Sequence, residues 1–423
     1  MLDLKFIRDN LDSVRENVKK RHVHADPDRV VSLYDQRNLV LRELEELRSK
    51  RNENAKRMKG KLPDEERQGL IEEGKRLKQE IPSKEQELAT IEEELQEEAA
   101  RLPNMTHPEV PLGEDDSANL ERRRVGSPTE RQPWMRDHVE IAQALDLIDF
   151  ETAAKVTGAK FYYLRNEAAF LELALVRMAM DAVARRGFTP TITPDIARQE
   201  VARGTGFNPR GPESNIYTLE NEDTCLVGTA EITLGGYHAG AVFTPEELPI
   251  RLAGFSHCFR REAGAAGQFS RGLYRVHQFS KVEMFVYCSP GESEEMLEEL
   301  VAVEEEIFQN LEIPYRVVDV AAGDLGGPAY RKFDLEAWMP GRGESGEWGE
   351  VTSASNCTDY QARRLNVRVR GEKGNEFLHM LNGTAVAVSR ALVALLENHQ
   401  QEDGSVRIPP ALQPYAGFEV IRR

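Results

Sequence analysis

Residues 1 to about 102 form the most regular pattern in the chain, with few aromatic residues and many Glu, Lys, Arg, Gln and Leu. A first helix is expected from about Asp3 to Lys20, and a second, behind an Asp26 suited to cap it, from Pro27 to about Gly60. Apolar residues then recur at heptad spacing, at Leu70, Leu77, Ile81, Leu88, Ile91, Leu95 and Leu102. The pattern predicts an antiparallel coiled-coil hairpin of about 34 residues per limb, roughly 50 Å long. We expect Pro82 to interrupt the return limb.

A Pro-rich linker is predicted at residues 103 to 118, and residues 119 to 423 mix helical and β-like segments. Helices are expected at Asp137 to Leu145, Glu167 to Arg186 and Pro290 to Leu311. Short β-like runs lie at Phe161 to Leu164, Thr189 to Thr193, Ile250 to Phe259, Val276 to Tyr287, Tyr315 to Val320, Lys332 to Trp338 and Glu347 to Ala354. Because their order is not a regular βαβ repeat, we predict an α+β domain with a largely antiparallel sheet flanked by helices.

The connection between two of these β-like runs carries spaced arginines. Arg260 follows the first run, Arg275 precedes the second, and glycines at 264, 267 and 272 lie between them, which predicts a loop between antiparallel strands. An arginine fork matches phosphate oxygens bidentately, and Phe279 offers a flat face to a nucleotide base. The segment therefore indicates a nucleotide-phosphate site. For the arginines alone, a solvated hairpin with surface charges is the simpler interpretation.

Three further motifs place polar groups beside apolar segments. Thr229 and Glu231 bring a hydroxyl and a carboxylate together, in a pattern that also fits plain helix capping. Glu350 and Ser353 would face opposite sides of a regular strand unless a bulge re-aims one, and such oxygen ligands suit Mg²⁺ better than zinc. Arg390 begins an apolar helix, either as a snorkelling side chain or, beside a nucleotide, as a contact to its base or terminal phosphate.

Composition narrows the class of protein. The chain has 423 residues, 40% of them hydrophobic, which is enough for more than one domain. No stretch approaches the roughly 20 apolar residues of a membrane span, and charged residues stand where a signal peptide has its apolar core. The four cysteines, Cys225, Cys258, Cys288 and Cys357, form no CxxC pair and indicate reduced thiols in a cytoplasm. A zinc site built from His257, Cys258, His277 and Cys288 is the less favoured alternative.

Charge is distributed unevenly along the predicted hairpin. The net charge of −17 argues against a general basic surface, yet basic residues gather in the outer half of the hairpin. Among them are Arg48, Arg51, Lys56, Arg57, Lys75 and Arg76. A charged coiled coil commonly serves as a spacer or an oligomerisation device. A basic outer half on an acidic protein instead favours binding of a polyanion such as an RNA or DNA backbone.

Taken together, these motifs resemble the class II aminoacyl-tRNA synthetases, and within them the seryl-tRNA synthetase family. The family's motif 2 is similar to Phe259 to Glu262 together with His277 to Glu283, and its motif 3 is similar to Asn382 to Asn398. Its motif 1 resembles Gly187 to Pro194, with Pro194 at the dimer-interface position, and Thr229 to Glu231 resembles its serine-site signature. Arg261 departs from the pattern, since the family commonly has a small Ser there. The resemblance covers nearly the whole chain, including the hairpin.

The resemblance implies a role for each matching residue. For ATP it implies Arg260 at the α-phosphate, Glu262 and Phe279 at the adenine, and Arg275 and Arg390 at the outer phosphates. It also implies ATP contacts from Arg261, Val276, Glu350, Val351, Thr352 and Ser353, with Mg²⁺ held by Glu350 and Ser353. The implied serine pocket comprises Thr229, Glu231, Arg260, Glu283 and Thr384, and the implied catalytic residues are Arg260, Glu283 and Arg390.

The implied activity is ATP-dependent ligation of L-serine to tRNA(Ser) through a seryl-adenylate. The implied enzyme is a cytoplasmic homodimer with no membrane association, whose basic hairpin binds the tRNA; charging of tRNA(Sec) is left open. Two alternatives are an amino acid-activating ligase for a carrier protein and a non-catalytic RNA-binding paralogue. The first predicts a missing or truncated hairpin, and the second predicts loss of Arg260, Glu283 or Arg390. The predicted hairpin is long, and Arg260, Glu283 and Arg390 are all present.

Overall fold

The computed structural model describes residues 1–208, 214–262, 271–372 and 374–423. The chain divides into two compact units, residues 1–105 and 106–423. The predicted domain limits, a linker over residues 103–118 included, remain predictions. Part of that segment packs into the second unit, where Val110 is buried with Val318 and Val320. Among the described residues, no helix combines the length and apolar character needed to cross a membrane.

The N-terminal unit begins with two short helices, α1 (Leu4–Asp9) and α2 (Leu11–Lys20), where one continuous helix was expected. The break lies at Asn10, whose backbone leaves the helical region at φ −127° and ψ 35°. The Asn10 side-chain amide donates to the carbonyl of Phe6 at 3.0 Å. A side chain that bonds its own backbone in this way competes with helix propagation, which explains the break.

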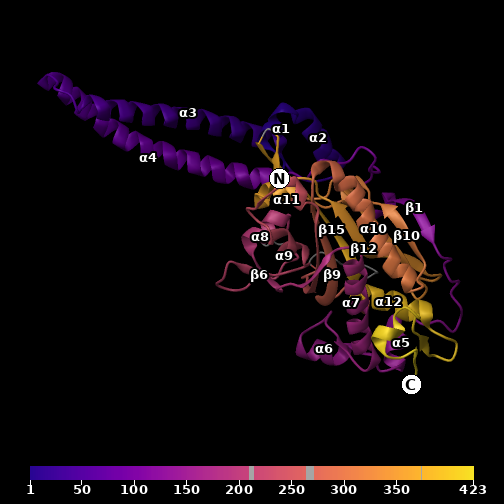
Figure 1. Ribbon diagram of the computed structural model, residues 1–423. Helices are drawn as coiled ribbons and strands as arrows, with labels where there is room; N and C mark the ends of the chain where they lie inside the picture. Colours follow the sequence, from indigo (N-terminus) through magenta and orange to yellow (C-terminus); the bar gives the residue numbers. More distant parts are fainter. Residues whose placement is uncertain (209–213, 263–270, 373) are drawn as a thin grey trace. The chain divides into compact units, whose positions relative to one another are not determined.

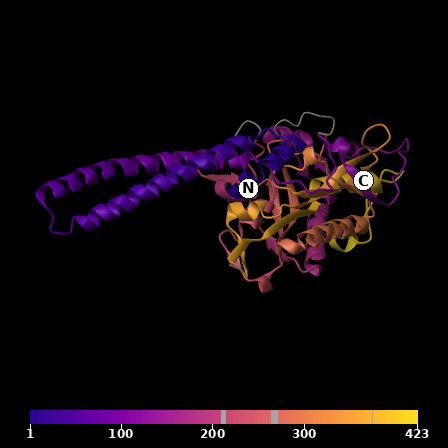
Figure 2. The ribbon, with the colours of Figure 1, turned by 90° about the horizontal axis from the view of Figure 1, so that it is seen from above.

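Two long helices, α3 (Pro27–Arg57) and α4 (Asp64–Arg101), run antiparallel as a hairpin (Figures 1 and 2). The predicted start of α3 is confirmed, because the Asp26 carboxylate caps the helix by accepting from the Arg29 amide at 3.0 Å. Leu44, Leu77 and Ile81 form the buried seam between the limbs. The expected interruption at Pro82 is wrong, since α4 continues through it. The buried contacts of Ile81, one residue earlier, hold the backbone helical at this exposed proline.

The second unit is built on an eight-stranded sheet in the order β1-β10-β11-β12-β15-β9-β8-β4. Its strands are β1 (Leu120–Val125), β4 (Thr189–Ile192), β8 (Ile250–Phe259), β9 (Gln278–Cys288), β10 (Tyr315–Asp319), β11 (Arg331–Met339), β12 (Glu347–Asn356) and β15 (His379–Ala387). Only the β4–β8 pair is parallel; the other neighbours are antiparallel. The predicted α+β class with a largely antiparallel sheet is confirmed.

Helices cover the sheet and enclose the main core (Figure 1). The larger ones are α5 (His138–Ala144), α7 (Glu167–Arg185), α10 (Ser293–Asn310) and α12 (Val388–His399). Shorter helices are α6 (Phe150–Val156), α8 (Gln199–Thr205), α9 (Glu231–Gly236), α11 (Tyr360–Leu365) and α13 (Gln413–Ala416), with one-turn helices η1 (Asp116–Ala118), η2 (Pro245–Glu247), η3 (Pro290–Glu292) and η4 (Ala322–Asp324). The short helices had no clear periodicity, because seven residues or fewer make less than two turns.

Small sheets complete the second unit. They pair β2 (Ile148–Asp149) with β3 (Tyr163–Leu164), β5 (Ile196–Arg198) with β6 (Thr224–Leu226), and β16 (Val406–Arg407) with β17 (Val420–Ile421). A three-stranded sheet joins β14 (Gly374–Phe377), β13 (Arg368–Gly371) and β7 (Val242–Phe243).

The connection from β8 to β9 is the loop between antiparallel strands that the glycine spacing predicted. Glycines 264 and 267 lie outside the described residues. Gly272 has φ +64°, and a Cβ there would meet Nε2 of His138 at 2.1 Å. A glycine is therefore required where the loop returns past α5.

Leu77→Ala is expected to destabilise the pairing of α3 with α4 by about 2–5 kcal/mol, because Leu77 is fully buried in the seam. Amide hydrogen exchange over residues 70–81 of the full chain should become faster. Leu39→Ala is the matched control, since Leu39 lies on α3 but is 58% exposed. Equal acceleration in both variants would contradict a packed seam.

Candidate active site

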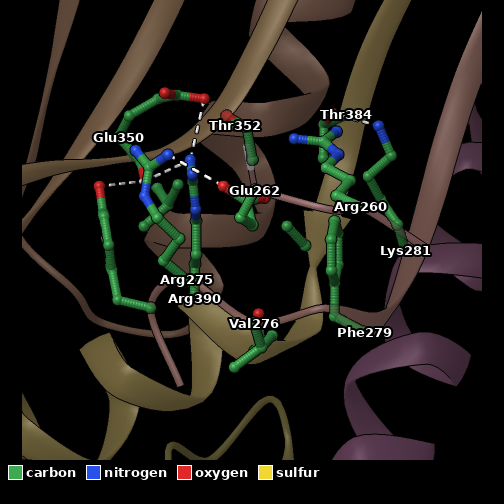
Figure 3. A pocket seen from close by; sticks show the side chains of 14 residues that line it. Arg260, Glu262, Arg275, Val276, Phe279, Lys281, Glu350, Thr352, Thr384 and Arg390 are labelled. Carbon is green, nitrogen blue, oxygen red and sulfur yellow. Dashed lines mark hydrogen bonds and ion pairs between the residues drawn. The ribbon is translucent and has the colours of Figure 1, made fainter. Parts of the chain in front are cut away.

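Strands β9, β12 and β15, the β8–β9 connection and the start of α12 surround one cavity (Figure 3). Its lining comprises Arg260, Glu262, Tyr274, Arg275, Val276, Phe279, Lys281, Glu350, Val351, Thr352, Thr384, Ala387, Ser389 and Arg390. Most of the predicted ATP residues are in this set. The structure thus brings together side chains that are up to about a third of the chain apart.

One side of the cavity is organised by Arg390, in the first turn of α12. Its guanidinium Nη1 lies 2.9 Å from Glu350 Oε1 and donates to the Glu350 carbonyl at 3.1 Å. The guanidinium carbon of Arg390 is 4.7 Å from the ring centre of Tyr274, and the Tyr274 hydroxyl donates to the same carbonyl at 3.0 Å. Burial acts to raise the pKa of Glu350, but Arg390, Lys332 and Arg260 outweigh it and lower that pKa. Glu350 is therefore a carboxylate at neutral pH.

Arg260 and Phe279 lie side by side because the backbones pair at the base of the β8–β9 connection. The Arg260 amide donates to the His277 carbonyl at 3.0 Å, and His277 Nδ1 lies 2.8 Å from the Arg260 carbonyl. This pairing leaves the Arg260 guanidinium 5.2 Å from the ring centre of Phe279. Arg260 Nε also donates to the Gly228 carbonyl at 3.2 Å, which fixes its direction.

The second predicted arginine of the connection, Arg275, pairs with Glu262. The distance between Arg275 Nη1 and Glu262 Oε2 is 2.9 Å. Glu262 has φ +49°, an uncommon value for a residue with a side chain. In Figure 3 the Arg275 and Arg390 side chains lie close together on one side of the cavity, whereas Arg260 lies on the other.

Beyond Arg260 the cavity ends at a buried polar cluster of Glu283, Lys281 and Thr384. Lys281 Nζ lies 2.5 Å from Glu283 Oε2, and the Thr384 hydroxyl donates to the same oxygen at 3.1 Å. The cluster follows from strand geometry. Residues 281 and 283 share one face of β9, and the sheet register sets Thr384 of β15 opposite Glu283. Lys281 carried no predicted role, although the two-residue spacing from Glu283 was a usable signal.

Glu231, at the start of α9, is a second buried carboxylate of this region, 8% exposed. Its Oε1 accepts from Gln361 Nε2 at 2.8 Å and from Asn382 Nδ2 at 3.0 Å. Burial and the nearby Glu283 raise the pKa of Glu231 to about 7, against the opposing effects of Gln361, Lys281 and Arg260. The buried Thr229 hydroxyl accepts from the Glu231 amide at 3.2 Å, so local capping also occurs.

Two predicted ATP residues are not part of the cavity lining. Arg261 is exposed, and its backbone amide donates to the Asn215 carbonyl at 2.9 Å. The Ser353 hydroxyl donates instead to Asp334 Oδ1 at 2.5 Å. A β-bulge, which the sequence pattern could not decide for or against, keeps Ser353 out of the cavity. The β11–β12 register passes from Leu335–Thr352 to Glu336–Glu350, which skips Val351 and turns Glu350 to Thr352 towards the cavity.

A further buried carboxylate lies beneath the cavity and was not predicted. Glu304 of α10 is 1% exposed and accepts from the Thr352 hydroxyl at 2.8 Å. Burial raises the pKa of Glu304 well above its ordinary value. The sequence signal is weak, because Glu304 stands in a run of three glutamates on an amphipathic helix.

The alternative zinc residues do not converge in the described part of the chain. His257 Nδ1 lies 2.8 Å from Asp195 Oδ2, whereas His277 Nδ1 faces the Arg260 carbonyl. Cys225, Cys258, Cys288 and Cys357 are buried, and none of them forms a disulfide within the described part of the chain. Among the described residues, no group of three or more His, Cys, Asp or Glu forms a possible metal cluster.

The predicted tRNA-binding residues lie on the surface of the α3–α4 hairpin. Arg48 pairs with Glu85, Arg57 with Glu66, and Arg76 with Glu73, at 2.7, 2.6 and 2.9 Å. Arg51, Lys56 and Lys75 are exposed. An exposed ion pair contributes little stabilising free energy, so the paired arginines stay available to a stronger anionic ligand.

Comparison with known proteins places these features in one family. Residues 1–106 match the family described as "Seryl-tRNA synthetase N-terminal domain", and residues 217–399 match "tRNA synthetase class II core domain (G, H, P, S and T)". The chain is 59% identical over 422 residues to the serine–tRNA ligase of Treponema denticola, covering 100% of both chains. It is 57% identical over 422 residues to that of Rubrobacter xylanophilus, covering 100% of this chain and 99% of the relative.

Solved structures agree with this result. The seryl-tRNA synthetase of Pyrococcus horikoshii, complexed with ATP, matches with a TM-score of 0.90 and 41% identity, covering 100% of this chain and 99% of the other. The cytoplasmic serine–tRNA ligase of Naegleria fowleri, in complex with AMP, gives 0.86 and 34% over the same shares. The chain therefore belongs to the seryl-tRNA synthetase family, the class II aminoacyl-tRNA synthetases that use ATP to ligate serine to tRNA.

Proposed function

We propose that the cavity between Arg260 and Arg390 is the site where serine is activated by ATP. One observation carries the proposal: Arg260 lies across the cavity from Arg275 and Arg390. Its charge also acts on the buried carboxylate Glu231, on which Glu283 acts as well. A cation at that point can contact an amino acid carboxylate and a phosphate at once. We also propose that the N-terminal domain ends at residue 102 and that the catalytic domain begins after residue 118.

On the ATP side, the proposed assignments follow the charges of the cavity. Phe279 offers its ring face to adenine and Glu262 accepts from the base, while Arg275 and Arg390 contact the outer phosphates. The existing ion pairs of Arg275 with Glu262 and of Arg390 with Glu350 hold both guanidiniums before ATP arrives. Such preorganisation lowers the reorganisation needed when phosphate charge develops.

On the serine side, Glu231 and Glu283 are the proposed partners of the ammonium and hydroxyl groups, with Thr229 and Thr384 beside them. Thr384 and Lys281 both engage Glu283 Oε2, and no described residue hydrogen-bonds Oε1. A substrate hydroxyl can donate to that second oxygen.

The proposed chemistry has two transfers. A serine carboxylate oxygen attacks the α-phosphorus of ATP, the bond to the bridging oxygen breaks, and diphosphate leaves. The 3′-terminal hydroxyl of the tRNA then attacks the seryl carbonyl, and AMP leaves. Arg260 stabilises the charge shared by the carboxylate and the α-phosphate, and the cavity acts mainly by positioning.

Mg²⁺ is proposed as a cofactor, and the donor chemistry supports Glu350 as its protein ligand. Glu350 is ionised and its side chain is 45% exposed at the cavity. One carboxylate together with substrate phosphates is a usual Mg²⁺ environment. Ser353 fits less well, because its hydroxyl is engaged by Asp334. Bound Mg²⁺ would supply positive charge at the phosphates.

A homodimer is proposed from the apolar surface beside motif 1. On α7, Phe170 is 60% and Leu173 66% exposed, and Ile192 at the end of β4 is 80% exposed. β4 is also the terminal strand of the sheet, so one of its edges pairs with no other strand of the described residues. Together with the exposed Pro194, this face is suited to a second copy of the chain.

The α3–α4 hairpin is the proposed tRNA-binding arm, through Arg48, Arg51, Lys56, Arg57, Lys75 and Arg76. Its ligand is tRNA(Ser), with tRNA(Sec) as a further acceptor to be assayed. The four cysteines form no disulfide among the described residues, which supports action in a reducing compartment such as the cytoplasm.

Glu283→Ala is expected to lower serine-dependent exchange of diphosphate into ATP by at least roughly 100-fold, since a charged hydrogen-bond acceptor for the substrate is lost. The measurement is isotope exchange in the full chain at saturating ATP. Glu305→Ala is the control, because Glu305 pairs with Arg123, away from the cavity lining. Exchange at the wild-type level in Glu283→Ala would refute the serine-site assignment.

Replacing Arg51, Lys56 and Lys75 together by Gln is expected to lower kcat/KM for tRNA roughly ten- to hundredfold and to weaken its salt dependence. Diphosphate exchange should not change, because the arm carries no residue of the cavity. A matched triple replacement of Lys5 on α1, Lys19 on α2 and Arg101 at the C-terminal end of α4, all exposed and outside the outer half of the hairpin, serves as the control. A similar loss of charging in both triples would argue against a specific role for the outer half.

A further inference from the structure

Gln361 of α11 is a fully buried amide that contacts one carboxylate of the proposed serine site. It is 0% exposed. Its Nε2 donates to Glu231 Oε1 at 2.8 Å and to the Thr205 carbonyl at 2.9 Å. The Thr205 carbonyl and the ionised Glu231 carboxylate can only accept, so the amide orientation is fixed: rotating it would point its oxygen at two acceptors.

The orientation has a cost that argues for a specific purpose. Gln361 Oε1 is buried, and no described group hydrogen-bonds it. A buried carbonyl oxygen without a donor is unfavourable. The amide is therefore retained for its two N–H groups, one of which is directed at Glu231.

The packing of α8 against α11 makes this contact possible. A Cβ at Gly204 would lie 2.4 Å from Cδ2 of Leu365, so only a glycine allows the two helices to approach this closely. The approach brings the Thr205 carbonyl, at the end of α8, within reach of Gln361. Gln361 is thereby anchored at one N–H while the other reaches Glu231.

Glu231 is held through one oxygen only. Gln361 and Asn382 both donate to Oε1, and no hydrogen bond from the described part of the chain reaches Oε2. The charged groups that face Glu231 are Glu283 and Lys281 of β9 and Arg260 at the end of β8. Glu283 repels a second negative charge, whereas the two amides and the two cations favour it.

We propose that Gln361 is a positioning residue for serine binding, which keeps Glu231 ionised and presents its Oε2 to the ammonium group of the amino acid. The inference rests on the proposed serine site. It adds a residue from a segment outside the motifs that resemble the family, in the stretch Asp359 to Arg364. Gln361 itself need not touch substrate.

The sign of the pH dependence follows from the charges. The pKa of Glu231 is raised to about 7, so the carboxylate ionises, and the ammonium should bind more tightly, as pH rises through about 7. A hydrogen bond to the ionised form lowers the pKa, so its removal moves the transition to higher pH. Substituting Gln361 leaves the charged neighbours of Glu231 unchanged, namely Glu283, Lys281 and Arg260.

The test measures kcat/KM for serine against pH in full-chain Gln361→Met, a replacement of similar length without polar hydrogens. The midpoint should move upward by about one pH unit or more, which lowers kcat/KM roughly tenfold on the acidic side. Well above the new midpoint the variant should recover to within about twofold of wild type. KM for ATP should not change, because Gln361 does not line the ATP cavity.

Gln400→Met is the matched control. Gln400 is also buried, and its Nε2 donates to two backbone carbonyls, those of Arg136 and Glu397, away from the serine site. It should lose stability without moving the midpoint. An unmoved midpoint in Gln361→Met, or a loss of equal size at every pH, would overturn the proposal.

A second variant keeps the test decisive should Gln361→Met not fold. Gln361→Glu preserves the shape but places two carboxyl groups in contact, so at neutral pH they must share a proton or repel. KM for serine is expected to rise at least roughly tenfold at neutral pH. A wild-type KM in this variant would also overturn the proposal.

Glu231→Gln tests the proposed serine site separately from the role of Gln361. Should it bind serine like the wild type, the proposed serine site itself fails. Should it lose serine binding while Gln361→Met shows an unmoved midpoint, the site stands and only the role of Gln361 fails.

Discussion

The burial of two carboxylates beside one another is the constraint on which the rest of this site depends. Glu231 and Glu283 are 8% and 1% exposed, and the nearby Glu283 raises the cost of ionising Glu231. Burying a charge is unfavourable unless it is paired and hydrogen-bonded. The surrounding structure must therefore supply donors in the right places. Lys281 and Thr384 supply them to Glu283, and Gln361 and Asn382 supply them to Glu231.

These donors come from three elements that are far apart in the sequence, namely β9, β15 and α11. The register of β9 against β15 brings Thr384 to Glu283, and β15 also carries Asn382. Gln361 arrives from α11, whose distance from α9 is set by the packing of α8. The cations Arg260 and Arg390 enter from a loop and from a helix start, and both lie at the rim of the same sheet.

Local signals in the sequence were sufficient for features that depend on neighbours along the chain. The heptads predicted the hairpin, the Asp26 cap marked the start of α3, and the run from Ile250 to Phe259 matched β8 residue for residue. They failed where a single side chain or a distant contact decides. Asn10 divides the first helix through its own side-chain hydrogen bond, and α4 continues through Pro82.

In the candidate site too, features set by local sequence were predicted and features set by distant contacts were not. Arg260, Arg275, Phe279, Glu350 and Arg390 were predicted and line one cavity, because each lies in a motif with a recognisable local pattern. The bulge that skips Val351 could not be read from residues 350 to 353, so Ser353 was expected in the cavity and is instead bonded to Asp334. Gln361 was invisible for another reason. Its proposed role requires Thr205 and Glu231, about 130 and more residues earlier in the chain, which no periodicity reveals.

The two carboxylates share a feature that bears on selectivity under the proposed assignment. In each, protein donors saturate one oxygen and leave the other without a partner from the described residues. Serine carries an ammonium and a hydroxyl that can complete both, whereas alanine would leave one buried oxygen unpaired, which is the costlier kind of mismatch. Threonine offers the same two donors, so hydrogen bonding cannot reject it. Discrimination against its additional methyl group must therefore come from the volume of the pocket.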